Sequence, residues 1–204
     1  MINSHNTLLM AGIGAAALFF LVATAEIFLR PGFSIARHAI SMLSLGERGW
    51  LMVATFIISG LLTVLFAMGV WQASGPWIGA LLFGLYGIGL VLAGVFPAPA
   101  GMGFPPGTPD DLMPVMDRGA IMHSVAFMVA FSSLIVASFV MAMHFWFAGA
   151  MMPALLLAVA GIAMPLLIGL GMAGIILTGV AFYIAAMIAW LVVVFVGLTL
   201  GGLA

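Results

Sequence analysis

The feature that most constrains this chain is a run of more than fifty residues without a charged side chain, from Ala150 to Leu203. A bilayer core is about 30 Å thick and takes roughly 20 apolar residues per helix, so this run holds two spanning helices. They would join near a cluster of glycines at 169, 171 and 174. The whole chain is similar, since 66% of its 204 residues are hydrophobic and 4% are charged. A water-soluble globule cannot cover its surface with so few charges, and we therefore expect a polytopic α-helical membrane protein.

The remaining apolar runs complete an all-α fold of six transmembrane helices in a single domain over residues 1–204. Their expected bounds are about 8–29, 50–71, 77–96, 119–145, 150–171 and 175–200. Pro165 either kinks the fifth helix or ends it. The first apolar run is longer than that of a signal peptide and no basic region precedes it, so we expect the first helix to be retained.

Composition also excludes several classes of function. Four arginines and no lysine leave no basic surface for nucleic acid. The absence of cysteine removes disulfides, thiolate metal ligands and thiol nucleophiles.

The charged residues gather on one side of the predicted membrane. The connections 30–49 and 97–118 share a face when there are six spans, and they contain all four arginines. The positive-inside rule favours a cytoplasmic location for this face. The opposite connections carry no Lys or Arg.

The segment 33–48 has too many polar residues to span a membrane and is expected to form an amphipathic helix at the headgroup level. On a helical wheel its polar face comprises Ser34, Arg37, His38, Ser41, Ser44 and Arg48. Its apolar face comprises Phe33, Ile35, Ala36, Ala39, Ile40, Met42 and Leu43. Two interpretations stay open: a connector whose arginines touch lipid phosphates, or a lid over a pocket in the bundle.

Glu26 is the only ionisable residue inside the first span. A charged group at this depth is costly and is a candidate functional residue. Arg30 follows four residues later, in the order that favours a helical ion pair, and such a pair explains Glu26 without any catalytic role.

The histidines do not predict a cofactor or a metal. His123 and His144 lie at the two ends of the fourth span. At a helical rise of roughly 1.5 Å per residue they are about 31 Å apart, so they cannot bind one haem or one metal ion. A zinc site formed by His38, His123 and an acidic residue is conceivable, but no paired histidine spacing supports it. His123 can still act alone as an acid, a base or a hydrogen-bonding group.

Several polar side chains share the charged side of the membrane and could converge there. As ligand-binding candidates we take Arg30, Arg37, His38, Ser41, Ser44 and His123. As catalytic candidates we take Glu26, Ser41, Ser44 and His123. A purely structural hydrogen-bonded cluster between helices one, two and four explains the same residues.

The connection 97–118 is long for a helical bundle and rich in proline and glycine, which favours an ordered extended coil over a helix. Asp117 is expected at the start of the fourth helix, where a carboxylate is favourable. A connection of this length is typical of a lid, a binding loop or a partner surface.

An ordered set of short motifs resembles the DUF998 family of multi-pass bacterial and archaeal membrane proteins, whose activity is unassigned. The set comprises 30–34, 37–41, 44–46, Gly60, 94–97, His123, Phe127 and Phe131. The resemblance implies a six-helix fold in a prokaryotic cytoplasmic membrane and little chemistry. The family often has an acidic residue soon after its Phe-Pro, where this chain reads Phe96-Pro97-Ala98-Pro99. Its basic residues tend to lie at the N-terminus and between helices two and three, where this chain has none, so orientation stays open.

Three functions follow as hypotheses. The first is non-enzymatic: binding a lipid or another hydrophobic molecule, or serving as accessory subunit of a membrane complex, for which 17 methionines provide adaptable apolar contacts. Its partners would be membrane lipids and other protein chains or copies of itself. The second is a lipid-headgroup enzyme with His123 as acid or base, Ser41 or Ser44 as nucleophile, and Arg37 as phosphate clamp. The third is a transporter, although the spans lack central charges and paired broken helices.

Overall fold

The computed structural model describes residues 4–73 and 75–202, and within them it is helical throughout its spans. In these ranges six helices are long and apolar enough to cross a membrane, which confirms the predicted fold class. They are α1 (Ser4–Leu29), α2 (Gly49–Gln72), α3 (Trp77–Val95), α4 (Arg118–Phe147), α5 (Met151–Met172) and α6 (Thr178–Leu200). A short 3-10 helix, η1 (Ile40–Ser44), lies between α1 and α2.

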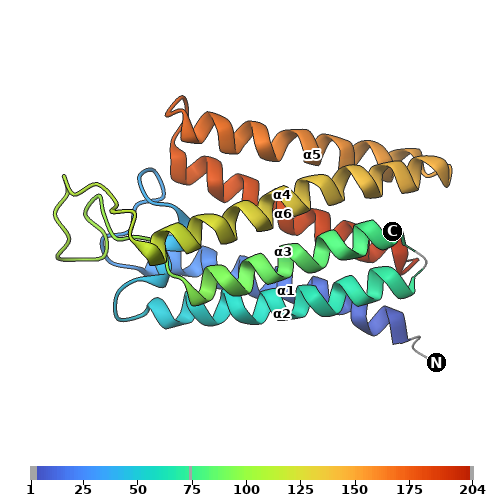
Figure 1. The fold of residues 1–204 in the computed structure, drawn as a ribbon, viewed down its shortest axis with the longest axis horizontal. Coiled ribbons are helices and arrows are strands. Elements are labelled where there is room, and N and C mark those ends of the chain that lie inside the picture. Colours follow the sequence, from blue (N-terminus) through green and yellow to red (C-terminus); the bar gives the residue numbers. More distant parts are fainter. Residues whose placement is uncertain (1–3, 74, 203–204) are drawn as a thin grey trace.

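The helices form a closed series in which each packs on the next and α6 returns to pack on α1 (Figure 1). Figure 1 shows α4 and α5 close together at their short connection and diverging toward the other end. In its most apolar stretch α5 has 22% of its residues buried, against 50% for α6, so α5 is the outermost helix.

Small residues allow close helix contacts inside the bundle. A Cβ atom on Gly60 of α2 would come within 2.6 Å of the carbonyl oxygen of Gly87 on α3, and the reverse is also true. A Cβ atom on Gly89 of α3 would come within 2.8 Å of the Cβ atom of Ala130 on α4. Without a hydrophobic driving force between helices in lipid, such close contact supplies much of the packing energy.

Pro165 lies inside α5, which continues to Met172, so it does not end the helix. Thr55 and Ser138 donate hydrogen bonds to carbonyl oxygens of their own helices, as isolated hydroxyls in spans commonly do. Ser59 instead donates from α2 to the carbonyl oxygen of Ala15 on α1, at 3.3 Å. This hydroxyl therefore joins two helices.

The expected amphipathic helix over 33–48 is wrong. Only the five residues of η1 are helical, and the rest of the segment consists of turns, bends and irregular backbone. The physical reason is competition for the backbone: Arg30 donates to the carbonyl oxygens of Leu43 and Leu45, and the ring of His38 accepts the Ser34 N–H. The predicted faces also fail, because His38 and Ser44 are buried together with Ile40 and Leu43.

The two charged connections lie at the same end of the bundle, at the left in Figure 1, as predicted. They pack on each other through a small apolar core of Met42, Ala98 and Phe104. The connection before α4 is ordered, with reciprocal backbone hydrogen bonds between Gly101 and Phe104. Asp117 caps α4 by accepting the Ala120 N–H at 2.8 Å, which confirms its predicted place. Together these connections form a cap on this end of the bundle.

Candidate binding cavity beneath the cap

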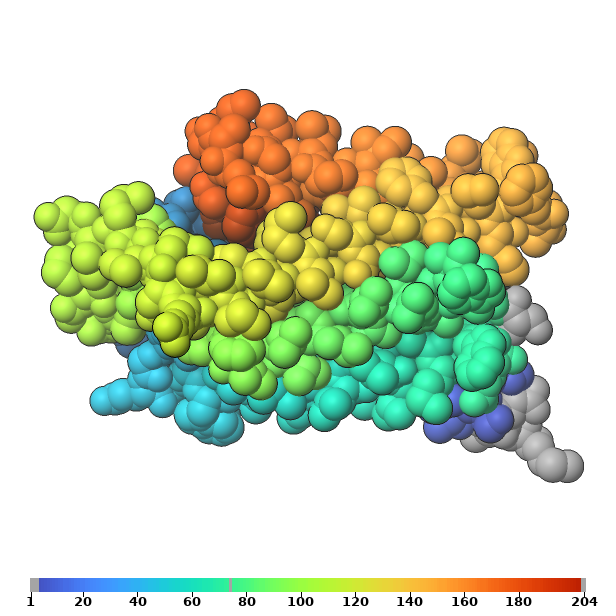
Figure 2. Space-filling view, viewed as in Figure 1, coloured from blue at the N-terminus to red at the C-terminus, as the bar shows by residue number. Residues whose placement is uncertain are grey.

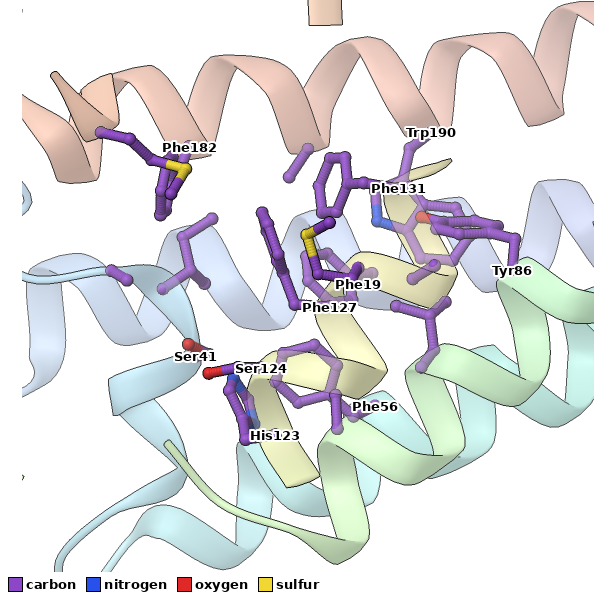
Figure 3. Close-up of a pocket in the computed structure, with 18 residues that line it drawn as sticks. Phe19, Ser41, Phe56, Tyr86, His123, Ser124, Phe127, Phe131, Phe182 and Trp190 are labelled. Carbon is purple, nitrogen blue, oxygen red and sulfur yellow. The ribbon is translucent and has the colours of Figure 1, made fainter. Parts of the chain in front are cut away.

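A cavity of about 310 Å³ lies inside the helix bundle, beneath the cap (Figure 3). Five helices and the cap segment 39–41 enclose it, with the end of α5 at its edge. The lining side chains are Phe19, Ala39, Ile40, Ser41, Phe56, Tyr86, Leu90, Ala93, His123, Ser124, Phe127, Met128, Ala130, Phe131, Met172, Phe182, Ala186 and Trp190.

The walls of the cavity are mainly aromatic. On α4 the rings of Phe127 and Phe131 lie 4.7 Å apart between centroids, and Phe127 stacks on Phe182 of α6 at 5.6 Å. Deeper in the bundle Trp190 packs against Phe19 at 5.2 Å. Aromatic rings contribute large apolar surfaces and prefer partners that offer ring faces or edges. The cavity is therefore suited to an apolar or ring-bearing molecule.

Polar groups gather at the cap end of the cavity, where Figure 3 shows Ser41, Ser124 and His123. His123 Nδ1 lies 2.6 Å from the carbonyl oxygen of Phe96. A carbonyl only accepts, so Nδ1 carries the proton and Nε2 of the neutral ring is an acceptor. Among the described residues Nε2 has no hydrogen-bond partner, and neither has the Ser41 hydroxyl.

The Ser124 hydroxyl donates to the carbonyl oxygen of Ala120 at 2.9 Å, so its lone pairs stay free to accept. The cap end therefore offers two acceptors and one free hydroxyl group. It can orient a polar group of a bound molecule, and it is the part of the cavity where acid–base chemistry could occur.

Two further polar groups lie at the deep end of the cavity. Tyr86 of α3 and Trp190 of α6 are 2% and 3% exposed, and their rings pack edge to face at 5.7 Å. Within the part of the chain that the structure describes, the Tyr86 hydroxyl and the Trp190 indole N–H make no hydrogen bond, although both residues line the cavity. Buried polar atoms normally have partners, and neither of these two is among the fully enclosed atoms that lack one, so both reach the open space of the cavity.

The cavity has a side opening toward the membrane region. Met128 of α4 and Met172 at the end of α5 both line it, and they are 59% and 70% exposed. Figure 2 shows the corresponding recess on the outer surface, between the end of α5 and the first half of α4.

Among the residues that the structure describes, no Asp, Glu, Lys or Arg lines the cavity. Glu26, one of the catalytic candidates, is buried elsewhere and accepts from Arg30 Nε at 2.8 Å and from Arg48. This confirms the ion pair expected from the spacing of Glu26 and Arg30. Arg30 is also bound to two backbone carbonyl oxygens.

The other candidates also lie outside the cavity. Arg37 is exposed and donates to Asp110 at 3.1 Å, so it does not reach the position of a phosphate clamp on the cavity. His38 uses both ring nitrogens, with Nδ1 accepting the Ser34 N–H and Nε2 donating to the carbonyl oxygen of Met102. The Ser44 hydroxyl donates to the carbonyl oxygen of Ser41 at 2.7 Å.

The structure therefore brings together only Ser41 and His123 of the predicted site residues. His38 and His123 do not meet, and the described residues contain no group of three His, Asp or Glu side chains that could hold a metal ion.

Sequence reasoning missed Ser124, Tyr86 and Trp190. One signal could have identified Trp190, since the other four tryptophans lie at helix ends and are at least half exposed, as in an aromatic belt. They are Trp50, Trp71, Trp77 and Trp146. Trp190 alone lies in mid-helix and is buried.

The sequence profile of the family described as "Protein of unknown function (DUF998)" matches residues 13–199. Since the match covers most of the 204 residues, the chain belongs to this family. No curated protein and no solved structure matches the chain.

Proposed function

We propose that this DUF998 membrane protein binds one hydrophobic molecule drawn from the bilayer and holds it in the cavity beneath the cap. The observation that carries the proposal is the cavity itself, which is aromatic along its walls and polar at its two ends. Ligand pockets are typically concave, mostly apolar and supplied with a few placed polar groups. At about 310 Å³ the cavity accommodates a single ring system or one chain of a lipid, and not a whole two-chain phospholipid.

The side opening supports a membrane origin for the bound molecule. Met128 and Met172 form its edge, and methionine side chains adapt their shape to a passing ligand. The cap covers the aqueous end through Ala39, Ile40 and Ser41. A molecule that enters between α4 and α5 therefore avoids crossing the polar cap.

Gentle purification from native membranes, followed by native mass spectrometry and solvent extraction, tests this function. We expect one hydrophobic molecule per chain in the wild type. Ala186→Phe places a ring in the cavity and should abolish its retention, because Ala186 lines the cavity. Ala17→Phe adds the same ring on the exposed side of α1 and should leave retention unchanged. A wild-type chain that carries no such molecule would contradict the proposal.

The same purification tests a place as accessory subunit of a membrane complex. The outer helix α5 and its groove with α6, lined by side chains such as Leu156, Leu191 and Phe195, are wholly apolar. A second protein chain that co-purifies in fixed stoichiometry would support the accessory role. A chain that carries the small molecule but no protein would leave binding as its function.

A second candidate function is an enzyme that acts on a membrane molecule, favoured by the meeting of His123, Ser41 and Ser124 at one end of the cavity. The Phe96 carbonyl orients the imidazole, and Nε2 is free to take a proton from a hydroxyl group. If His123→Ala and Ser41→Ala leave the lipid composition of the host unchanged, this candidate fails.

We also propose that the charged cap faces the cytoplasm, following the positive-inside rule. The chain has no cysteine, so single-cysteine variants at Arg37 and Asp111 can be labelled without background. Both positions should react from the cytoplasmic side. Labelling from opposite sides would contradict both the orientation and the shared cap.

A further inference from the structure

We infer that the bound molecule is an uncharged, conjugated carbonyl compound, such as a quinone, whose carbonyl oxygen accepts hydrogen bonds from Tyr86 and Trp190. This inference rests on the proposed binding function and specifies the ligand. It is drawn from the two unpartnered polar groups at the deep end of the cavity.

The deep end offers donors. The Trp190 indole N–H can only donate, and the Tyr86 hydroxyl is free to donate because no described residue accepts its proton. Figure 3 shows Tyr86 and Trp190 together at this end, and their ring centroids are 5.7 Å apart. An acceptor oxygen placed between them would satisfy both, and each bond gains strength in surroundings of low polarity.

The lining excludes a charged end group at this position. The described residues that line the cavity include no Asp, Glu, Lys or Arg, so an anionic or cationic group would lack a counter-ion. Two arginines near the cap are engaged elsewhere, with Arg30 on Glu26 and Arg37 on Asp110. A neutral acceptor such as a carbonyl oxygen avoids this desolvation cost.

The walls next to the two donors favour a flat molecule. Phe19 packs on Trp190 at 5.2 Å, and Tyr86 packs on the same ring at 5.7 Å, so ring faces and edges surround the deep end. Along α3, Tyr86 precedes the cap-end carbonyl of Phe96 by ten residues. At a rise of roughly 1.5 Å per residue this spacing is about 15 Å along the helix axis. A conjugated ring at the donors leaves room for a short hydrocarbon chain that exits at Met128 and Met172.

The test uses two probes that differ only in the carbonyl groups, 2-methyl-1,4-naphthoquinone and 2-methylnaphthalene. Saturable binding to the purified full chain is measured by equilibrium dialysis against detergent micelles without protein. We expect the wild type to bind the quinone about tenfold more tightly than the hydrocarbon, the size that one or two hydrogen bonds supply. Tyr86→Phe should reduce this preference about three- to tenfold while leaving the hydrocarbon affinity unchanged.

Tyr183→Phe is the matched control, because it removes the same hydroxyl from a residue outside the cavity lining, where it bonds to Thr24. It should keep the wild-type preference. Trp190→Phe should reduce the preference as Tyr86→Phe does, and an unchanged hydrocarbon affinity shows that each variant is folded.

Equal affinity for the two probes, or a preference that Tyr86→Phe does not alter, would overturn the carbonyl assignment and leave the binding function standing. Failure to bind either probe would also overturn it. The binding function itself fails only if the purified wild type carries no hydrophobic molecule.

Discussion

The bundle contains two groups of buried polar side chains, one beneath the cap and one along the cavity, and they differ in how their hydrogen bonds are satisfied. In the first, Glu26 accepts from Arg30 and Arg48, and Arg30 also donates to the carbonyl oxygens of Leu43 and Leu45. In the second, the cavity residues His123, Tyr86 and Trp190 keep polar atoms that no described residue satisfies. The chain completes the first group by itself and leaves the second open to a ligand.

The difference separates stability from function. Arg30 fixes two carbonyl oxygens of the cap while its charge is neutralised by Glu26, so this group fastens the cap to α1. Breaking it must affect folding. The cavity residues His123, Tyr86 and Trp190 make few hydrogen bonds within the chain, so substituting them should affect binding more than folding.

The largest effect on stability is expected from Glu26→Gln. It leaves Arg30 buried without its counter-ion. Removing one partner of a buried pair costs about 3–5 kcal/mol. Thermal denaturation followed by fluorescence-detected size exclusion measures the loss. Glu47→Gln, on an exposed neighbour in the cap, should leave the melting temperature unchanged. Equal melting temperatures for the two variants would show that the Glu26 group does not fasten the cap.

A smaller loss is expected from Gly179→Ala at the start of α6. The new Cβ atom would collide with the carbonyl oxygens of Ile35 and His38, which pack directly on Gly179. Overpacking of this kind costs about 1–3 kcal/mol, and it also displaces the cap above the cavity. We expect a lower melting temperature together with weaker retention of the bound molecule.

Gly169→Ala provides the control, since a Cβ atom at this position of α5 meets nothing within 4 Å. It should leave both stability and retention unchanged. If Gly179→Ala lowers stability but retains the molecule fully, the cap does not close the cavity.

Arg37→Ala should have a minor effect. The Arg37 side chain is 50% exposed and that of its partner Asp110 is 83% exposed. A surface pair of this kind contributes less than about 1 kcal/mol. We expect a slightly lower melting temperature in low salt and none of the loss seen with Glu26→Gln. A loss as large as that of Glu26→Gln would mean that the Arg37 bond to the Met102 carbonyl oxygen holds the cap together.

The sequence predicts most of this fold because membrane helices are specified by length and hydropathy alone. The six spans, the shared face of the charged connections, the Asp117 cap and the pair of Glu26 with Arg30 all depend on local spacing. The segment 33–48 is different, since its structure is set by Arg30 and by Met102 of the second connection. A helical wheel contains no such tertiary contacts, and for that reason its two faces are wrong.

The cavity could be predicted only in part for a similar reason. His123 and Ser41 stood out as polar residues on the charged side, whereas Tyr86 and Trp190 resemble ordinary apolar residues of a span. Their role depends on how α3, α4 and α6 pack around the cavity, and a single sequence does not specify this packing. The mid-helix position of Trp190 was the one local signal.

We expect the smallest effect on stability from Tyr86→Phe in the ligand-free protein. This variant also tests most directly whether the cavity residues differ from the Glu26 group. The lost hydroxyl has no partner among the described residues. The free energy of unfolding should therefore change by less than about 0.5 kcal/mol, the lower end of what one hydrogen bond contributes. Tyr183→Phe removes a hydroxyl that bonds α6 to Thr24 of α1. The loss of that bond should cost about 1 kcal/mol.

Thermal denaturation of both variants after removal of bound molecules measures the difference. If Tyr86→Phe proves the more destabilising of the two, the Tyr86 hydroxyl supports the fold. If Tyr86→Phe is the less destabilising of the two, the Tyr86 hydroxyl contributes little to folding, and its role is to bind the molecule in the cavity.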